Sequence, residues 1–456
     1  IAPNMIDSSN VYLAFKHDDS TFLIDFEPYT TNATWTNYAD SLISDGLVEG
    51  YNFNSIHTTA NQLFVIGGSP TGYIDFIIPS GYNTCDITYG NANPNTGAVI
   101  LSINGQNVDQ IDTTSSKTYT ATNIVANQTI RISETVSGIN YIIKLFYYNS
   151  QTSYTVNFPE DTTCDILIVG GGGGGGTVEY TATSGTGGGG GGGGVIFLQN
   201  QTVSSGTYII KVGKGGKGDD FNDDTEKTGQ NGYNSSFSYL YTEAIGGGGG
   251  GSRTDHDPGQ SNRNDNNTQG KTGGSGGGSS HGNSSTMSGG LGTISDILLA
   301  DQTTVLITNY RQGYDAGTVQ YESPYSSGGG GAGGNGNDSS GTDDGNGGIG
   351  RAEENGVDFK TYFNMGSGIG EHHTDSKVYF AGGGSSGYRN NDSNHSNGGL
   401  GGGGSSNNGI SQNGVANTGG GGGGARSGDG GTLQNGGNGG SGIVIIRYSS
   451  TKTTEN

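Results

Sequence analysis

Residues 164–176, CDILIVGGGGGGG, decide the interpretation of the second half of the chain. Apart from Asp165, the first six residues are apolar, and three of them are β-branched, which is typical of a buried strand. Seven glycines follow without a break. A strand that runs into glycine can begin a phosphate-binding loop, a flexible linker or a structural element built from glycine, and the rest of the sequence separates these alternatives.

A phosphate-binding loop needs a helix after the glycines, because the N–H groups at its start hold the anion. Residues 177–186 are TVEYTATSGT, which has neither an amphipathic period nor the lysine of a P-loop. The sequence therefore does not predict a nucleotide site.

Glycine blocks recur along the second half and alternate with short strands. Linkers join domains, whereas these blocks join strands that must bury a face together. We therefore expect the blocks to form polyproline-II-type helices that pack side by side, which only a residue without Cβ permits. A Gly→Val change within 187–194 should then disrupt the domain, and the flexible linker stays the alternative. The blocks cover 170–176, 187–194, 246–251, 328–331, 382–384, 401–404 and 419–424, with Gly170, Gly176, Gly187, Gly194, Gly246, Gly251, Gly419 and Gly424 as structural glycines.

A similar strand entry occurs twice. Residues 76–90 are FIIPSGYNTCDITYG and residues 158–170 are FPEDTTCDILIVG. The match predicts two related antiparallel β-sandwich domains in tandem, each with its cysteine at the same inward-facing position. Cys85 and Cys164 are then buried thiols, with a Cys85–Cys164 disulfide as the alternative.

The predicted fold class is all-β, with long glycine-rich loops in the C-terminal domain. We expect an N-terminal assembly segment at 1–58, a β-sandwich at 59–150, the glycine-rich sandwich at 151–449 and a polar tail at 450–456. In the first segment, 11–15 and 21–26 look like a hairpin around His17, and 37–47 like a short helix. The core candidates of the first sandwich are Leu63, Val65, Ile74, Phe76, Ile87, Ile100, Ile130, Ile142 and Leu145.

Composition excludes several partners. A net charge of −22, with 19 Lys and Arg against 41 Asp and Glu, leaves no basic patch for nucleic acid. No apolar run reaches the roughly 20 residues of a membrane-spanning helix, so we expect no membrane insertion. Asn-x-Ser/Thr triplets are candidate glycosylation sites, although a chain so rich in Asn, Ser and Thr also makes them by chance. They lie at Asn32, Asn127, Asn200, Asn234, Asn266, Asn283, Asn337, Asn391 and Asn394.

Few residues suggest chemistry. One loop gathers Asp219, Asp220, Asp223, Asp224 and Glu226, oxygen ligands of the kind Ca²⁺ prefers, although a solvated acidic loop explains them as well. His372 and His373, with Glu371 and Asp375, could bind a metal, but neighbouring side chains on a strand point to opposite faces. No catalytic set of Ser, His and Asp has a recognisable context, so we expect no enzyme and no cofactor other than this Ca²⁺. Aromatic and planar groups that could stack on sugars are Trp35, Tyr38, Tyr388 and Arg389.

Three groups of motifs occur in a fixed order. The first is TVNFPEDTTCDILIVGGGG at 155–173. The second is VSSGTYIIKVGKGG at 203–216, GYNSSFS at 232–238 and AIGGG at 244–248. The third is VYFAGGG at 378–384, NTGGGGGG at 417–424 and GGSGIVIIRY at 439–448.

With this ordered set, roughly residues 152–449 resemble the glycine-rich fibre and adhesin domains of tailed phages and related virus-encoded or environmental surface proteins. The resemblance implies a β-sandwich framework with polyglycine-II loops and a location outside the cell or on a virion. The acidic insert at 217–226 departs from the family pattern. We expect a structural subunit of a fibre or filament that associates with itself. The alternative is a receptor-binding adhesin that recognises host surface glycans or proteins.

Overall fold

In the computed structural model the 456-residue chain forms two compact units. The glycine-rich unit contains residues 1–18 and most of 151–456, and the inserted unit is built from residues 19–150. The expected all-β class is confirmed, with several antiparallel sheets and very little helix. The structure describes residues 5–6, 10–18, 21–23, 48–51, 55–59, 62–66, 72–91, 98–111, 116–135, 140–178, 186–218, 228–253, 268–280, 287–319, 326–339, 345–387, 396–407, 410–426 and 435–449.

The inserted unit consists of two antiparallel sheets that share one core. The first sheet has the order β10 (Gln106–Ile111), β9 (Val99–Ile103), β12 (Thr129–Glu134), β7 (Tyr73–Ile77) and β4 (Val48–Tyr51). The second has the order β11 (Ser116–Thr122), β8 (Thr84–Asn91), β13 (Asn140–Tyr148), β6 (Gln62–Ile66) and β5 (Ser55–Thr59), and β3 (Thr21–Leu23) also pairs with β13.

Alternation along the strands fills this core. Ile74, Phe76, Ile87, Ile130 and Leu145 are buried in it, as expected. Ile100 was assigned to the wrong face: it is only half-buried, and its neighbours Val99 and Leu101 enter the core. A strand of three successive apolar residues does not reveal from sequence which face is buried. The side chains of Leu63, Val65 and Ile142 lie outside the described residues.

The glycine-rich unit is built on a five-stranded sheet in the order β1 (Met5–Ile6), β2 (Asn10–Lys16), β27 (Ile443–Ser449), β15 (Thr162–Val169) and β16 (Val195–Val203). A second sheet contains β14 (Gln151–Phe158), β17 (Gly206–Gly213) and β18 (Ser236–Phe237). The smaller elements are the pairs β19 (Ile294–Leu298) with β20 (Val305–Arg311), β21 (Glu353–Glu354) with β22 (Val357–Asp358), β23 (Glu371–His372) with β24 (Val378–Tyr379), and β25 (Ser406–Asn407) with β26 (Ile410–Ser411), and the single turn α2 (Phe359–Tyr362).

The predicted N-terminal hairpin is wrong. β2 pairs along its whole length with β27, from Asn10 opposite Ser449 to Lys16 opposite Ile443, and β3 pairs with β13 of the inserted unit. The side chain of Phe15 is 2% exposed and its ring lies 5.3 Å from that of Tyr154. A local hairpin would have a lower entropic cost, because it closes only a short loop. The free energy gained by burying Phe15 in a large core outweighs that difference. The helix expected at 37–47 lies outside the described residues.

The five-stranded sheet is buried on both faces. Cys164, Ile166 and Ile168 of β15 face a core that also contains Ile210 of β17 and Phe237 of β18. On the opposite face, Leu167 and Val169 belong to a second core together with Phe359, Phe363 and Phe380. A strand with apolar residues on both faces reads as a continuous apolar run, which is the pattern of 166–169. Within the described residues, no helix has the length and hydropathy to cross a membrane.

Candidate functional site: the glycine bundle and a surface pocket

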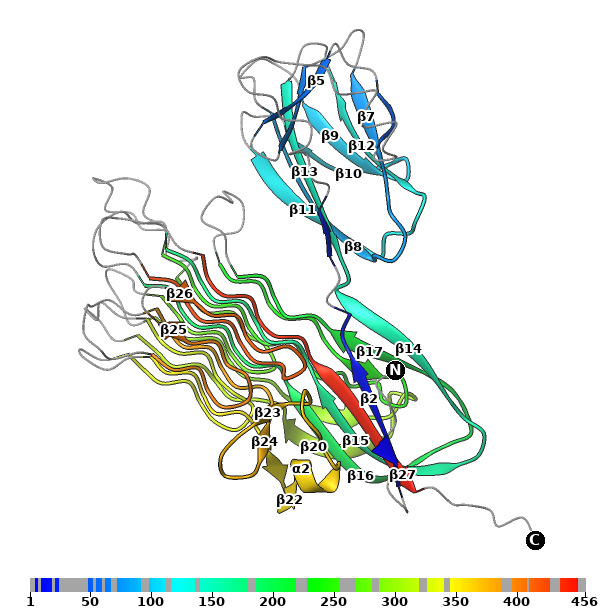
Figure 1. Cartoon of the computed structure of the whole chain (residues 1–456), viewed down its shortest axis with the longest axis vertical. Coiled ribbons are helices and arrows are strands. Elements are labelled where there is room, and N and C mark those ends of the chain that lie inside the picture. The colour runs from blue at the N-terminus through cyan, green and yellow to red at the C-terminus, as the bar shows by residue number, and fades with distance from the viewer. Residues whose placement is uncertain are drawn as a thin grey trace. The chain divides into compact units, whose positions relative to one another are not determined.

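Four strands of the glycine-rich unit continue directly into glycine segments, which run side by side away from the sheets (Figure 1). β15 leads into 170–176, β17 leads into 214–218, and 187–194 and 435–442 lead into β16 and β27. The backbone hydrogen bonds of 170–176 change partner with a period of three. Gly170, Gly173 and Gly176 donate to the carbonyl oxygens of 194, 191 and 188, at 2.8–3.0 Å. A period of three residues is the repeat of a polyproline-II-type helix.

Each of two central segments is surrounded by six others. Segment 170–176 donates to 188–194, 230–233 and 437–440, and accepts from 247–250, 216 and 422–425. Segment 187–194 donates to 419–425, 245–251 and 327–330, and accepts from 170–176, 275–278 and 384–387. The backbone groups that a free glycine chain would leave to water are thus paired between neighbours, which permits their burial.

The centre of this bundle has no room for a side chain. A Cβ added to Gly191 would meet the carbonyl oxygen of Ser275, and one added to Gly173 would meet that of Gly248, both well inside van der Waals contact. The same holds for the structural glycines predicted at Gly170, Gly176, Gly187, Gly194, Gly246, Gly251 and Gly424. Apart from Gly401 and Gly402, the described glycine blocks are therefore packed helices and not flexible linkers.

Two positions in the predicted blocks serve another purpose. Gly401 and Gly402 have φ of +105° and +84° and form a turn, so the block 401–404 does not begin as a helix. Both of their N–H groups donate to one carboxylate oxygen of Glu371, at 2.6 Å. Gly419 also has a positive φ, of +73°, where its segment enters the bundle.

Several helices of the bundle escaped sequence analysis because they are not pure glycine. In 213–218, Lys214 and Lys217 are three residues apart, so both fall on the same side of a threefold helix while the glycines face its neighbours. Segments 229–233 and 435–442 are built in the same way. A glycine spacing of three was the signal that could have revealed them.

A buried polar network joins the bundle to the edge of the five-stranded sheet. The Tyr310 hydroxyl donates to Glu354 at 2.7 Å and accepts from the backbone N–H of Phe197 at 3.1 Å. Arg351 donates to Glu354, to the Tyr310 hydroxyl, and to the carbonyl oxygens of Ala332 and Arg311. Burial raises the pKa of Tyr310, so its hydroxyl stays protonated and can donate. Sequence analysis missed this network, since its residues are far apart in the chain.

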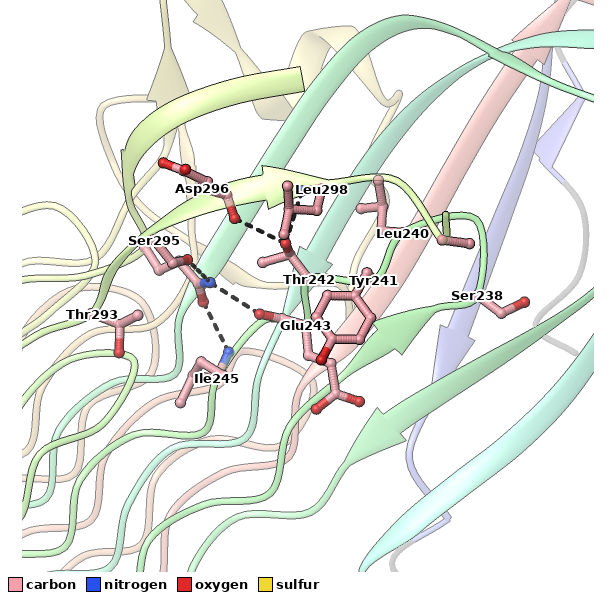
Figure 2. A pocket seen from close by; sticks show the side chains of 12 residues that line it. Ser238, Leu240, Tyr241, Thr242, Glu243, Ile245, Thr293, Ser295, Asp296 and Leu298 are labelled. Atoms are coloured by element: carbon pink, nitrogen blue, oxygen red, sulfur yellow. Dashed lines mark hydrogen bonds between the residues drawn. The ribbon is translucent and has the colours of Figure 1, made fainter. Parts of the chain in front are cut away.

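An open pocket of about 780 Å³ lies between residues 238–245 and β19 (Figure 2). The buried Gln312 forms its floor, donating to Ser295 Oγ and Glu243 O and accepting from the N–H of Ile245. The side chain of Tyr241 forms a wall and is 55% exposed. The side-chain amide of Gln312 is thus already hydrogen-bonded to residues that line the same pocket.

Several predicted site residues lie outside the described part of the chain. These are Asp219, Asp220, Asp223, Asp224 and Glu226 of the calcium hypothesis, and Trp35, Tyr38, Tyr388 and Arg389 of the sugar-stacking hypothesis. The same applies to the glycosylation candidates Asn32, Asn266, Asn283, Asn391 and Asn394. The calcium hypothesis therefore stays a prediction.

The other four glycosylation candidates differ in accessibility. Asn127, Asn200 and Asn337 are exposed. Asn234 is half-buried, and its side chain donates to Glu243 Oε2 at 2.7 Å and accepts from the N–H of Gly246. A glycan on Asn234 would have to break this pairing, so Asn234 is the least suited of the four.

The histidine pair does not form a metal site. His372 Nε2 lies 2.9 Å from the carbonyl oxygen of Gly366, His373 Nδ1 lies 3.3 Å from Asp375, and Glu371 binds backbone N–H groups. Across the described segments, no three His, Cys, Asp or Glu side chains are grouped as metal ligands. Cys85 and Cys164 are buried free thiols. Burial, and secondarily the charge of Asp165, raises the pKa of Cys164 to about 12.

Comparison with known proteins identifies a family for most of the glycine-rich unit. The model of a family described as a glycine-rich domain matches residues 149–449, which include every strand of the unit except β1 and β2. A search of curated proteins finds no match to the chain.

Proposed function

Because the chain belongs to the glycine-rich domain family, we propose that it is a structural subunit of an extracellular or virion-surface fibre or filament. In this proposal the glycine bundle is the stiff body of the subunit, and its partners are other copies of the same chain. The protein has no enzymatic role and needs no cofactor in this proposal.

The observation that carries the proposal is that segments 170–176 and 187–194 are each hydrogen-bonded to six neighbouring segments. No central helix can bend or leave without breaking hydrogen bonds to several neighbours at once, so the bundle resists bending and local opening. Proteases require a locally opened chain, and such a body would survive outside the cell. The high content of small uncharged residues gives the same body few groups for charge-mediated binding.

Electron microscopy of the purified chain and of its native assembly tests this proposal. We expect regular polymers in which one glycine-rich unit repeats along the axis. Gly191→Val, which the bundle cannot accommodate, should abolish them, whereas Tyr241→Phe at the exposed pocket wall should leave them intact. Single particles that never polymerise and that bind cells would contradict the structural role.

An adhesin is the second candidate, favoured by where the glycine helices end. Val178 pairs with Arg253, and Thr186 pairs with Arg426. These four residues end described glycine segments, and they lie together at the end of the bundle away from the sheets (Figure 1). The segments next to these residues in sequence, such as TDHDPGQSNRNDNN at 254–267 after Arg253, are polar and varied. A rigid bundle that presents such segments suits the recognition of a host glycan or surface protein.

A glycan array distinguishes the two candidates. An adhesin should bind a defined glycan and lose that binding when 254–267 is replaced by a Gly-Ser segment of equal length. A structural subunit should bind no glycan and should polymerise with or without the replacement.

A further inference from the structure

β14 has an open edge along its whole length. Its eight residues pair with β17, from Gln151 opposite Gly213 to Phe158 opposite Gly206. It ends the strand order β14-β17-β18, and none of the described residues pairs with its other side. Figure 1 shows β14 at the outer side of the glycine-rich unit.

The backbone groups of alternate β14 residues point to this edge. Ser238 donates its N–H to the carbonyl oxygen of Ile209 at 2.8 Å, and the N–H of Ile209 donates to Ser238 Oγ, so the backbone of Ile209 faces away from β14. Ile209 is directly opposite Thr155, and the two therefore form a pair without mutual hydrogen bonds. By the alternation of an antiparallel ladder, Ser153, Thr155 and Asn157 direct their N–H and C=O groups to the open edge.

The edge lacks the usual protection against strand pairing. Natural edge strands carry Lys, Pro, bulges or inward charges, whereas QTSYTVNF contains no charge and no proline and pairs with β17 without a bulge. The β16 edge of the neighbouring sheet is covered, because the Tyr310 hydroxyl and the Gln312 carbonyl oxygen accept from Phe197 and Val195. The contrast within one unit indicates that β14 is kept open for a partner.

We propose that the partner is β14 of a second copy of this chain, paired antiparallel about a twofold axis at Thr155. Thr155 then faces Thr155 of the second copy, and Ser153 faces its Asn157. All three side chains are exposed, and Thr–Thr and Ser–amide pairs across strands are favourable. Each chain carries a net charge of −22, so two copies approach best at a surface without charge, and this strand supplies one.

The pairing joins two three-stranded sheets into one continuous sheet across the axis. The interface is small, so we expect a weak dimer that depends on concentration. The inference rests on the self-association in the proposed function but not on the fibre. A twofold contact closes on itself, so a filament would need a second, different contact.

Charge substitution at Thr155 tests the register. Thr155→Lys alone and Thr155→Glu alone should each be monomeric in analytical ultracentrifugation, because like charges meet on the axis. An equimolar mixture should restore the dimer. Thr202→Lys is the control, an exposed threonine on β16 in the other sheet of the unit, and it should leave the dimer unchanged.

A single cysteine provides an independent measurement. Thr155→Cys should form an intermolecular disulfide on mild oxidation, since directly paired residues have the required Cα separation, whereas Thr202→Cys should not. Cys85 and Cys164 are buried and do not compete. A wild-type chain that stays monomeric at the highest attainable concentration overturns the inference and leaves the stiffness of the bundle untouched. This interface is refuted if the Thr155→Lys variant still dimerises, or if the equimolar mixture of the Lys and Glu variants stays monomeric. Self-association of the wild-type chain would stand in either case.

Discussion

Single glycines in the bundle are under steric constraint, and Gly191 is a direct test. An added Cβ would collide with the carbonyl oxygen of Ser275, which itself accepts the N–H of Gly248. Backbone must move, so we expect Gly191→Ala to lower the free energy of unfolding by about 1–3 kcal/mol or more. Urea denaturation followed by circular dichroism measures the change.

Gly334→Ala is the matched control for Gly191→Ala. Gly334 lies in the same unit, but an added Cβ would meet only the movable side chain of Ile349, at 3.1 Å. We expect a change near zero, since alanine also reduces the entropy of the unfolded chain. Equal effects of the two substitutions would show that the central helices are loose, contrary to the packed arrangement.

The Cys164 thiol is expected to be inert in the folded chain. Burial raises its pKa to about 12, so at pH 8 the thiol is neutral, and the thiolate is the reactive form. The unfolded thiol ionises at about 8.5. Above that value the unfolded state gains by ionisation and the unit loses stability until the pH passes the folded pKa. Alkylation followed by peptide mass spectrometry should label Cys164 only in denaturant, and rapid labelling of the native chain would contradict its burial.

Among the structural elements, the link between β20 and β16 depends on one hydroxyl. Tyr310→Phe removes the acceptor of the buried Phe197 N–H and the donor to Glu354, which is half-buried and keeps its bond from Arg351. We expect a loss of about 1–3 kcal/mol in the free energy of unfolding. Tyr241→Phe, at an exposed tyrosine, is the control and should change little. Identical denaturation midpoints for both variants would mean that the network contributes no stability.

Some elements could be predicted from sequence and others could not, for a physical reason. β15, β16 and β27 each contain a run of four apolar residues buried on both faces, at 166–169, 195–198 and 443–446, and such runs are visible in any sequence. β2 could not be assigned to its sheet, because its partner β27 lies more than 400 residues away and the local hairpin pattern was equally good. Pairing over such a distance is decided by core burial, here that of Phe15, and not by neighbouring residues.

For the whole molecule, the packing of glycine helices could be predicted from the blocks, but its extent could not. The two central segments are pure glycine because six neighbours surround them. Peripheral helices such as 213–218 face solvent on one side and carry Lys214 and Lys217 there, so their sequences resemble ordinary loops. The pocket beside Gln312 and the open edge of β14 depend on tertiary contacts and on the absence of a neighbour, neither of which a sequence pattern reports.

Cooperativity of the whole bundle gives the last prediction. Gly190 donates to Gly422 and its neighbour Gly191 donates to Gly248, so successive amides of one central helix are bonded to different helices. Gly191 also accepts from Gly173 of the other central helix. No helix can expose its amides without opening its neighbours. We expect the amides of 170–176 and 187–194 to exchange with one common free energy, equal to that of unfolding of the unit. Native-state hydrogen exchange by mass spectrometry measures it.

The response to a substitution separates cooperative from local opening. Gly191→Ala lies in only one of the two central segments, yet it should lower the exchange free energy of both by the same amount, because both open only when the bundle opens. The exposed Val415, whose N–H is bonded to Gly402 near the outside of the bundle, should exchange earlier in both proteins. Loss of protection confined to 187–194 in the variant would mean that this helix can leave alone, and the bundle could not then act as a stiff body.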